Sequence, residues 1–191
     1  IGRNTQVLVK FEASLLEQYL ADDNVTMLKF VLENYYNLLP ESNQDIKLKH
    51  RVLAGLKTAV GVIASDFEWE DETGSRSLHK LTGTDYYIVL FFSSDCPHCQ
   101  VETPEFYDFI SGIENIQVVA VGLEDQKENW EQMTEGYDEF INILDLEKWS
   151  STKVKDYGVM GIPSYFVLDS DKRILAKPED FEELKSMFEE K

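Results

Sequence analysis

The strongest constraint on the fold is YYIVLFF, a continuous run of apolar and β-forming residues from Tyr86 to Phe92. Runs of this kind are typical of strands that are buried on both faces of a sheet. IQVVAVG, from Ile116 to Gly122, has the same character, and Pro97 suits the first position of a helix between the two runs. Strands that alternate with helices predict an α/β domain with a central sheet, which we place at residues 61–191.

Residues 1–60 have a helical pattern instead. In FEASLLEQYLA, one helix face collects the apolar side chains Phe11, Leu15, Leu16, Tyr19 and Leu20. A third helix of this segment is expected to begin at Ser42 or Asn43. Three short helices make a thin core, and the chain begins with Ile1 rather than Met. We therefore expect these helices to pack either on the rest of the chain or on a missing N-terminal region, and the segment to be the end of a larger N-terminal region of a processed or truncated protein.

The region around Gly74 predicts a change of direction. SDFEWEDETGSRSL indicates a short strand, a turn at Gly74 and then a helix capped by Ser75 or Ser77. Towards the end of the chain, PSYFVLD and RILAKP predict two strands around a polar turn at residues 169–172. PEDFEELKSMFEE predicts a closing amphipathic helix.

The composition excludes several classes of function. The net charge of −18 argues against binding to nucleic acid or to anionic membrane surfaces, because both need a basic face. No apolar run reaches the length that spans a bilayer. The two cysteines, Cys96 and Cys99, are too few for a disulfide-stapled scaffold.

These cysteines lie in SSDCPHCQ, a Cys-x-x-Cys motif at a predicted helix start. Cys96 would face unpaired backbone N–H groups and the positive end of the helix dipole, which favour a thiolate. Cys99, one turn further along, would be shielded and could complete an exchange that Cys96 begins. Pro97 and His98 lie between them, and the His98 ring can stabilise the thiolate and so make the disulfide a better oxidant.

The motif has three other interpretations. A zinc ribbon needs a second ligand pair, but the chain has no further cysteine, and His50 and His79 are isolated in the sequence. A purely structural disulfide across so short a loop would stabilise little. A peroxidase would have proline and threonine where this chain has Val89 and Ser93.

A second signal lies far downstream, in GIPSYFVLD. Pro163 stands directly before a predicted buried strand, where it cannot donate to the ladder of hydrogen bonds. A cis Ile162–Pro163 bond would let Ile162 present its backbone to an extended substrate while Pro163 packs beside Cys96. An ordinary trans proline at a strand start is the alternative.

Together these motifs resemble the thioredoxin-like superfamily, and more closely its TlpA/ResA branch of envelope thiol-disulfide oxidoreductases. The resemblance covers about two-thirds of the chain and is carried by SDFEWEDETGSRSLHKL, IVLFFSSDCPHCQVETP, VVAVGLEDQKENW and VKDYGVMGIPSYFVLDSDKRI. A helix and strand inserted between Gly122 and Asp145 are typical of that branch. The resemblance implies a thioredoxin-like fold with a central mixed sheet flanked by helices, preceded here by a short helical segment.

The resemblance also implies roles for single residues. Cys96 corresponds to the attacking cysteine, Cys99 to the resolving cysteine and Pro163 to the cis-proline. Glu102 matches an acidic residue that tunes the cysteines or moves protons, although a solvated surface carboxylate is the alternative. Asp95 replaces the tryptophan that usually precedes the motif.

Two further departures concern the buried aspartate of thioredoxins and the direction of electron flow. Leu90 stands where thioredoxins carry that aspartate, while the Pro-His dipeptide resembles DsbA-type oxidases. The frame therefore resembles reductases and the motif resembles oxidases. The direction is left open, because it also depends on the partner's potential.

We therefore predict a protein thiol-disulfide oxidoreductase of the bacterial periplasm or cell envelope that needs no metal or organic cofactor. Its partners would be client proteins with cysteine pairs, held along Ile162 and the cysteine helix, and a redox protein that recycles it. A non-catalytic binding module and a disulfide isomerase are the alternatives.

Overall fold

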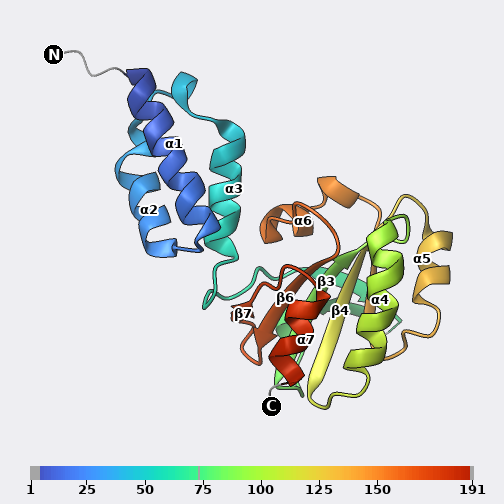
Figure 1. Cartoon of the computed structure of the whole chain (residues 1–191). Coiled ribbons are helices and arrows are strands. Elements are labelled where there is room, and N and C mark those ends of the chain that lie inside the picture. Colours follow the sequence, from blue (N-terminus) through green and yellow to red (C-terminus); the bar gives the residue numbers. More distant parts are fainter. Residues whose placement is uncertain (1–4, 73, 190–191) are drawn as a thin grey trace. The chain divides into compact units, whose positions relative to one another are not determined.

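The computed structural model describes residues 5–72 and 74–189 (Figure 1). Ile1, on which the expectation of a longer protein rests, lies outside these ranges. The chain divides into two compact units, residues 1–59 and 60–191. Within the described residues, no helix combines the length and apolar character needed to cross a bilayer.

The first unit is a bundle of three helices, α1 (Thr5–Ala21), α2 (Val25–Asn34) and α3 (Ile46–Lys57). Short 3-10 helices at Tyr36–Leu38 and Glu41–Asn43 connect α2 to α3. The bundle has its own apolar core, formed by Leu16, Leu28, Val31, Leu32, Tyr36, Leu48 and Val52. Asp45 caps α3 by accepting hydrogen bonds from the amides of Lys47 and Leu48, so the expected start at Ser42 or Asn43 is wrong.

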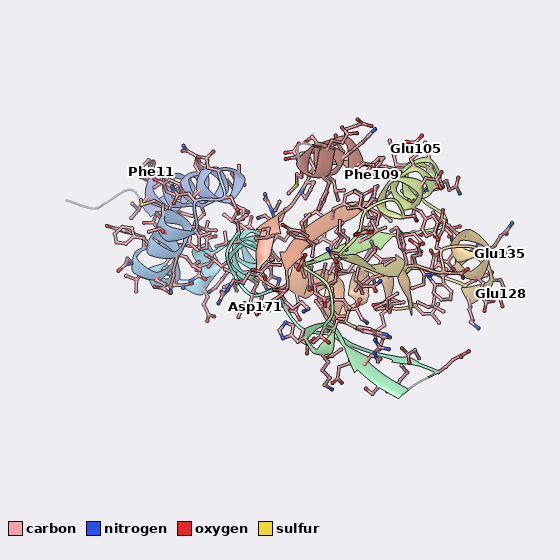
Figure 2. The ribbon with its side chains drawn as sticks, turned by 90° about the horizontal axis from the view of Figure 1, so that it is seen from below. Phe11, Glu105, Phe109, Glu128, Glu135 and Asp171 are labelled. Carbon is pink, nitrogen blue, oxygen red and sulfur yellow. The ribbon has the colours of Figure 1, made fainter. Side chains whose placement is uncertain are left out.

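The buried face of α1 differs from the expected face at Phe11. Phe11 is 59% exposed and projects from the helix in Figure 2, whereas Glu12 is only 5% exposed. The rest of the expected face is confirmed, since Leu16 is buried and Leu15, Tyr19 and Leu20 are partly buried. Burial raises the pKa of Glu12.

The second unit begins with an antiparallel hairpin of β1 (Glu68–Asp71) and β2 (Gly74–Ser77). The short strand before Gly74 is confirmed. The helix expected after Gly74 is wrong, because the residues after it pair with β1 and only then form a 3-10 helix, Leu78–Lys80. Pairing with a neighbouring strand outweighs the local capping signal of the serines.

The central sheet of this unit has five strands in the order β5-β4-β3-β6-β7. The strands are β3 (Tyr86–Phe92), β4 (Ile116–Leu123), β5 (Ile141–Asp145), β6 (Ser164–Asp169) and β7 (Ile174–Ala176). β3, β4 and β5 run parallel, whereas β6 is antiparallel to β3 and to β7. The predicted α/β domain with a mixed sheet is thus confirmed.

Helices cover the sheet, and alternate residues of β3 face its two opposite sides. The remaining helices are α4 (Pro97–Ile110), α5 (Lys127–Thr134), α6 (Thr152–Tyr157) and α7 (Phe181–Glu189). Ile88 and Leu90 of β3 share one apolar cluster with residues of α4 and α7. Val89 and Phe91 point the other way, into a cluster with α6 and the hairpin. Both faces of β3 are therefore buried, as its apolar run predicts.

The parallel strands β3 and β4 end at the same edge of the sheet, because Phe92 is paired with Gly122. Residues 93–95 follow β3 and lead into α4, while Glu124 follows β4. In parallel sheets, ligand-binding and active sites commonly lie at the carboxyl ends of neighbouring strands. This edge carries the cysteine motif.

Candidate active site

Cys96 is the N-cap residue of α4, directly before Pro97. Its amide donates to the carbonyl of Ser93 at 3.2 Å, and its carbonyl accepts from the Gln100 amide at 3.0 Å. The Cys99 amide donates to the Cys96 sulfur at 3.4 Å. A thiolate at this position would be stabilised by that N–H group and by the helix dipole. The half-buried side chain of Cys96 retains contact with solvent.

Cys99 has the opposite environment. Its side chain is 0% exposed and packs in the cluster between the sheet and α4. Burial raises the pKa of the Cys99 thiol, and a hydrogen bond with Cys96 and the negative charge of Glu102 act in the same direction. Both cysteines are free and lie 3.0 Å apart. The structure therefore places an accessible sulfur beside a shielded, protonated one.

The buried thiol leads to a prediction about stability and pH. Because its pKa is raised in the folded protein, Cys99 keeps its proton when the unfolded chain loses one, above about pH 8.5. Stability from this group is present below that pH and is lost as the pH rises. The free energy of unfolding of the reduced protein should fall by about 1.4 kcal/mol per pH unit from this group.

Urea unfolding of the reduced wild type and of Cys99→Ala, between about pH 8 and 10, measures this effect. The difference between the two slopes isolates Cys99 from other groups that titrate in that range. Equal slopes in the two proteins would show that the folded structure does not hold this thiol neutral.

Ile162 and Pro163 approach Cys96 from a distant part of the chain. The Cys96 thiol donates to the Ile162 carbonyl oxygen at 3.6 Å, and the peptide bond between Ile162 and Pro163 is cis. Both residues are half-buried, and β6 begins directly after them. The two signals that are far apart in the sequence, the cysteine motif and the Ile-Pro pair, are thus neighbours in the structure.

Glu102 lies one turn beyond Cys99 on α4. One of its carboxylate oxygens accepts a hydrogen bond from the Tyr165 hydroxyl at 2.9 Å and from the Phe181 amide at 3.0 Å. Burial, followed by the nearby Glu102 charge, raises the pKa of Tyr165, which therefore stays a donor. Glu102 is half-buried and oriented by α7 and β6, unlike a freely solvated surface carboxylate.

Pro97 and His98 are exposed on the first turn of α4, on one side of a groove of about 490 Å³. Val101 and Phe181 contribute apolar surface to this groove. Its carboxylate-bearing residues are Glu102, Glu105, Asp180 and Glu182. Glu105 projects from α4 in Figure 2. The groove extends the surface beside the cysteines.

Metal-ligating residues do not converge elsewhere in the described chain. Over residues 5–72 and 74–189, no group of three or more His, Cys, Asp or Glu residues could hold a metal ion. His50 and His79 are both exposed, and a ring nitrogen of His79 lies 2.8 Å from the Ala64 carbonyl.

Sequence reasoning missed Glu124 and Ser94. Glu124 follows β4 and is 0% exposed, and its carboxylate oxygens accept from the Ser94 amide and hydroxyl, both at 2.6 Å. A weak signal was present, because Glu124 is the first charged residue after a buried strand that ends at the same edge as the cysteine strand.

Comparison with known proteins identifies the family. Residues 83–174 match the family described as Thioredoxin-like. A domain of a possible thiol-disulfide isomerase from Cytophaga hutchinsonii is 30% identical, with a TM-score of 0.57 over 69% of this chain and 91% of that domain. The chain belongs to the thioredoxin-like superfamily. Curated proteins give no match.

Two other solved structures show the extent of the thioredoxin-like fold. The thioredoxin domain of a thiol-disulfide oxidoreductase from Bacteroides vulgatus is 22% identical, with a TM-score of 0.58 over 69% of this chain and 96% of that domain. A thioredoxin-like protein from Bacteroides caccae is 16% identical, with a TM-score of 0.65 over 96% of this chain and 76% of that protein. At these identities the likeness concerns the fold, and the predicted fold class is confirmed.

Proposed function

We propose that this thioredoxin-like protein is a thiol-disulfide oxidoreductase that exchanges disulfides with cysteine pairs of client proteins. The observation that carries the proposal is the asymmetry of the cysteines. Cys96 is half-exposed at the N-cap of α4, and Cys99 is buried 3.0 Å away. An accessible attacking sulfur with a shielded resolving sulfur is the arrangement that disulfide exchange requires.

The exchange has two steps. The Cys96 thiolate attacks one sulfur of a client disulfide, so that a Cys96–client disulfide forms and the other client sulfur leaves as a thiolate. The Cys99 thiolate then attacks the Cys96 sulfur, which releases the second client sulfur and leaves a Cys96–Cys99 disulfide. The client gains two electrons and the cysteine pair loses two. The reverse sequence oxidises a client dithiol.

The surroundings of Cys96 support an extended client. The carbonyl of Ile162 lies 3.6 Å from the sulfur and could accept a hydrogen bond from a client backbone amide once the thiol no longer uses it. Pro163 would pack beside the mixed disulfide. Pro97, His98 and the groove beside them would receive the flanking client residues.

Partners and location are part of the same proposal. Besides its clients, the protein would need a second redox protein to return its cysteines to the starting state, and no metal or organic cofactor. We place the protein in the bacterial envelope or periplasm and in the TlpA/ResA branch because of its sequence motifs, and the structural neighbours described above also come from bacteria.

The experiment that tests the function is catalysed reduction of insulin by dithiothreitol, together with the reduction potential of the Cys96–Cys99 pair. A potential near about −120 mV would indicate an oxidase, and one near about −270 mV a reductase. Repair of scrambled ribonuclease would favour an isomerase. If insulin reduction is no faster than without the protein, and scrambled ribonuclease is not repaired, the proposal fails and a binding module remains.

Glu102 is proposed to accept the proton of Cys99. Since burial raises the pKa of Cys99, its thiol needs a base before it can attack the mixed disulfide. We expect Glu102→Gln to slow this second step by about tenfold or more at neutral pH. Rapid mixing followed by acid quench measures the decay of the mixed disulfide.

The sign of this effect is diagnostic. If Glu102 acted only through its negative charge, its removal would lower the pKa of Cys99 and would accelerate the second step. Asp108→Asn is the matched control, because Asp108 is an exposed carboxylate on the same helix and does not line the groove. A faster second step in Glu102→Gln would contradict the role as proton acceptor.

A further inference from the structure

Glu124 is a fully buried carboxylate that the exchange steps above do not use. It follows β4 and is 0% exposed. Its two oxygens accept short hydrogen bonds from one residue, with Ser94 donating its amide to Oε1 and its hydroxyl to Oε2, both at 2.6 Å. Buried carboxylates are costly unless they are fully hydrogen-bonded. Both oxygens of this buried carboxylate are hydrogen-bonded to Ser94, which precedes the attacking cysteine by two positions.

Ser94 belongs to the loop of residues 93–95, which joins β3 to α4. Its carbonyl oxygen accepts from the Gln100 side chain at 2.7 Å, so the residue is held from the sheet side by Glu124 and from the helix side by Gln100. The preceding residue, Ser93, accepts from the Cys96 amide at 3.2 Å. These contacts therefore fix the backbone segment that leads into Cys96.

The contacts of the Cys96 sulfur depend on the position of this loop. The Cys96 sulfur makes two long contacts, 3.4 Å to the Cys99 amide and 3.6 Å to the Ile162 carbonyl. Small movements of the loop would change both, and misplacement of a reacting group by about 1 Å can reduce a rate by about 10²-fold. A negative charge close to the loop would by itself disfavour a thiolate.

We propose that Glu124 is a positioning residue for disulfide exchange, which acts by clamping Ser94 and thereby sets the Cys96 sulfur against the first turn of α4. The proposal rests on the proposed function. It predicts that the hydrogen bonds of Glu124, and not its charge, sustain the reactivity of Cys96.

The test measures alkylation of Cys96 by iodoacetamide across the pH scale, in a Cys99→Ala background where Cys96 is the sole thiol. Glu124→Ala should slow alkylation at neutral pH by about tenfold, because the loop that carries the Cys96 sulfur loses the contacts that hold it in place. Glu124→Gln should stay within about threefold of the parent, since its amide can accept from the Ser94 amide and donate to the Ser94 hydroxyl oxygen.

Asp145→Ala is the matched control. Asp145 is another buried carboxylate, 4% exposed, which accepts from the Ser151 hydroxyl at 2.6 Å and from Lys153 at 3.0 Å. Its loss should lower the unfolding temperature but leave the alkylation profile of Cys96 unchanged. If Glu124→Ala behaves in the same way, Glu124 is only a structural residue and the proposal is overturned.

Three further outcomes decide the remaining cases. Faster alkylation in both Glu124→Ala and Glu124→Gln would show that charge dominates, which also overturns the proposal. If Glu124→Ala does not fold, Ser94→Ala removes the hydroxyl contact alone and should slow alkylation by about threefold, while no change would count against the clamp. A parent protein whose Cys96 is as inert as a peptide thiol would instead refute the proposed function.

Discussion

Replacement of Cys96 by serine is expected to abolish catalysed disulfide exchange. A serine hydroxyl is not ionised at neutral pH and cannot form the mixed disulfide, so the first step has no nucleophile. The catalysed rate of insulin reduction should fall by about 10³-fold or more, to the background given by dithiothreitol. Insulin turbidity measures it directly. Oxygen differs from sulfur by little in size, and the side chain is half-exposed, so the fold should be retained.

A surface control separates loss of chemistry from loss of structure. Glu128→Gln changes an exposed carboxylate of α5, which projects outward in Figure 2, and should keep the wild-type rate. Circular dichroism should give both variants the wild-type fold. If Cys96→Ser retains a substantial part of the wild-type rate, the cysteines are not the reacting groups, and the thioredoxin-like unit is better described as a binding module.

The parts of the fold that the sequence predicts are those with strong local signals. The continuous apolar run at residues 86–92 requires a strand that is buried on both faces, and the structure places it between β4 and β6. Pro97 favours a helix start, and α4 begins there. Such signals depend only on residues that are close together in the sequence. They can therefore be recognised without knowledge of long-range contacts.

The errors have the opposite origin. The serines after Gly74 can cap a helix, but in the hairpin Ser75 pairs with Glu70 and Ser77 pairs with Glu68, five and nine residues away. Within α1, Glu12 is buried in place of its neighbour Phe11, although the apolar pattern favours Phe11. Tertiary packing decides both cases.

Some residues of the candidate site are likewise predicted by local sequence patterns, and others are not. The cysteine motif and the Ile-Pro pair are recognisable as sequence patterns, and the structure brings Cys96 and Ile162 together. The contact between Glu124 and Ser94 joins residues 30 positions apart. Neither residue type is unusual in its own segment, so only the pairing of β3 with β4 shows that they meet.

Cys99→Ala should convert the protein from a catalyst into a trap for its clients. The first step is unaffected, because Cys96 keeps its exposure and its place at the N-cap of α4. The second step has lost its nucleophile, so the Cys96–client disulfide persists until an external thiol cleaves it. We expect about tenfold more covalent adduct than with the wild type. Non-reducing electrophoresis of mixtures with a disulfide-bonded client, before and after dithiothreitol, measures the adduct.

Because Cys99 is buried, the proposal requires clients to be attached to the sulfur of Cys96. Because Cys99 is 0% exposed, a client cannot reach it before Cys96 has reacted, so peptide mapping of the wild type should find every adduct on Cys96. Cys96→Ala is the matched control and should form none, although it retains a cysteine. Adducts on Cys99 in that variant, or only non-covalent complexes with Cys99→Ala, would contradict the division of labour between the two sulfurs. Partial trapping by Glu102→Gln would also support this division of labour, because the second step in that variant is limited by removal of the proton from Cys99.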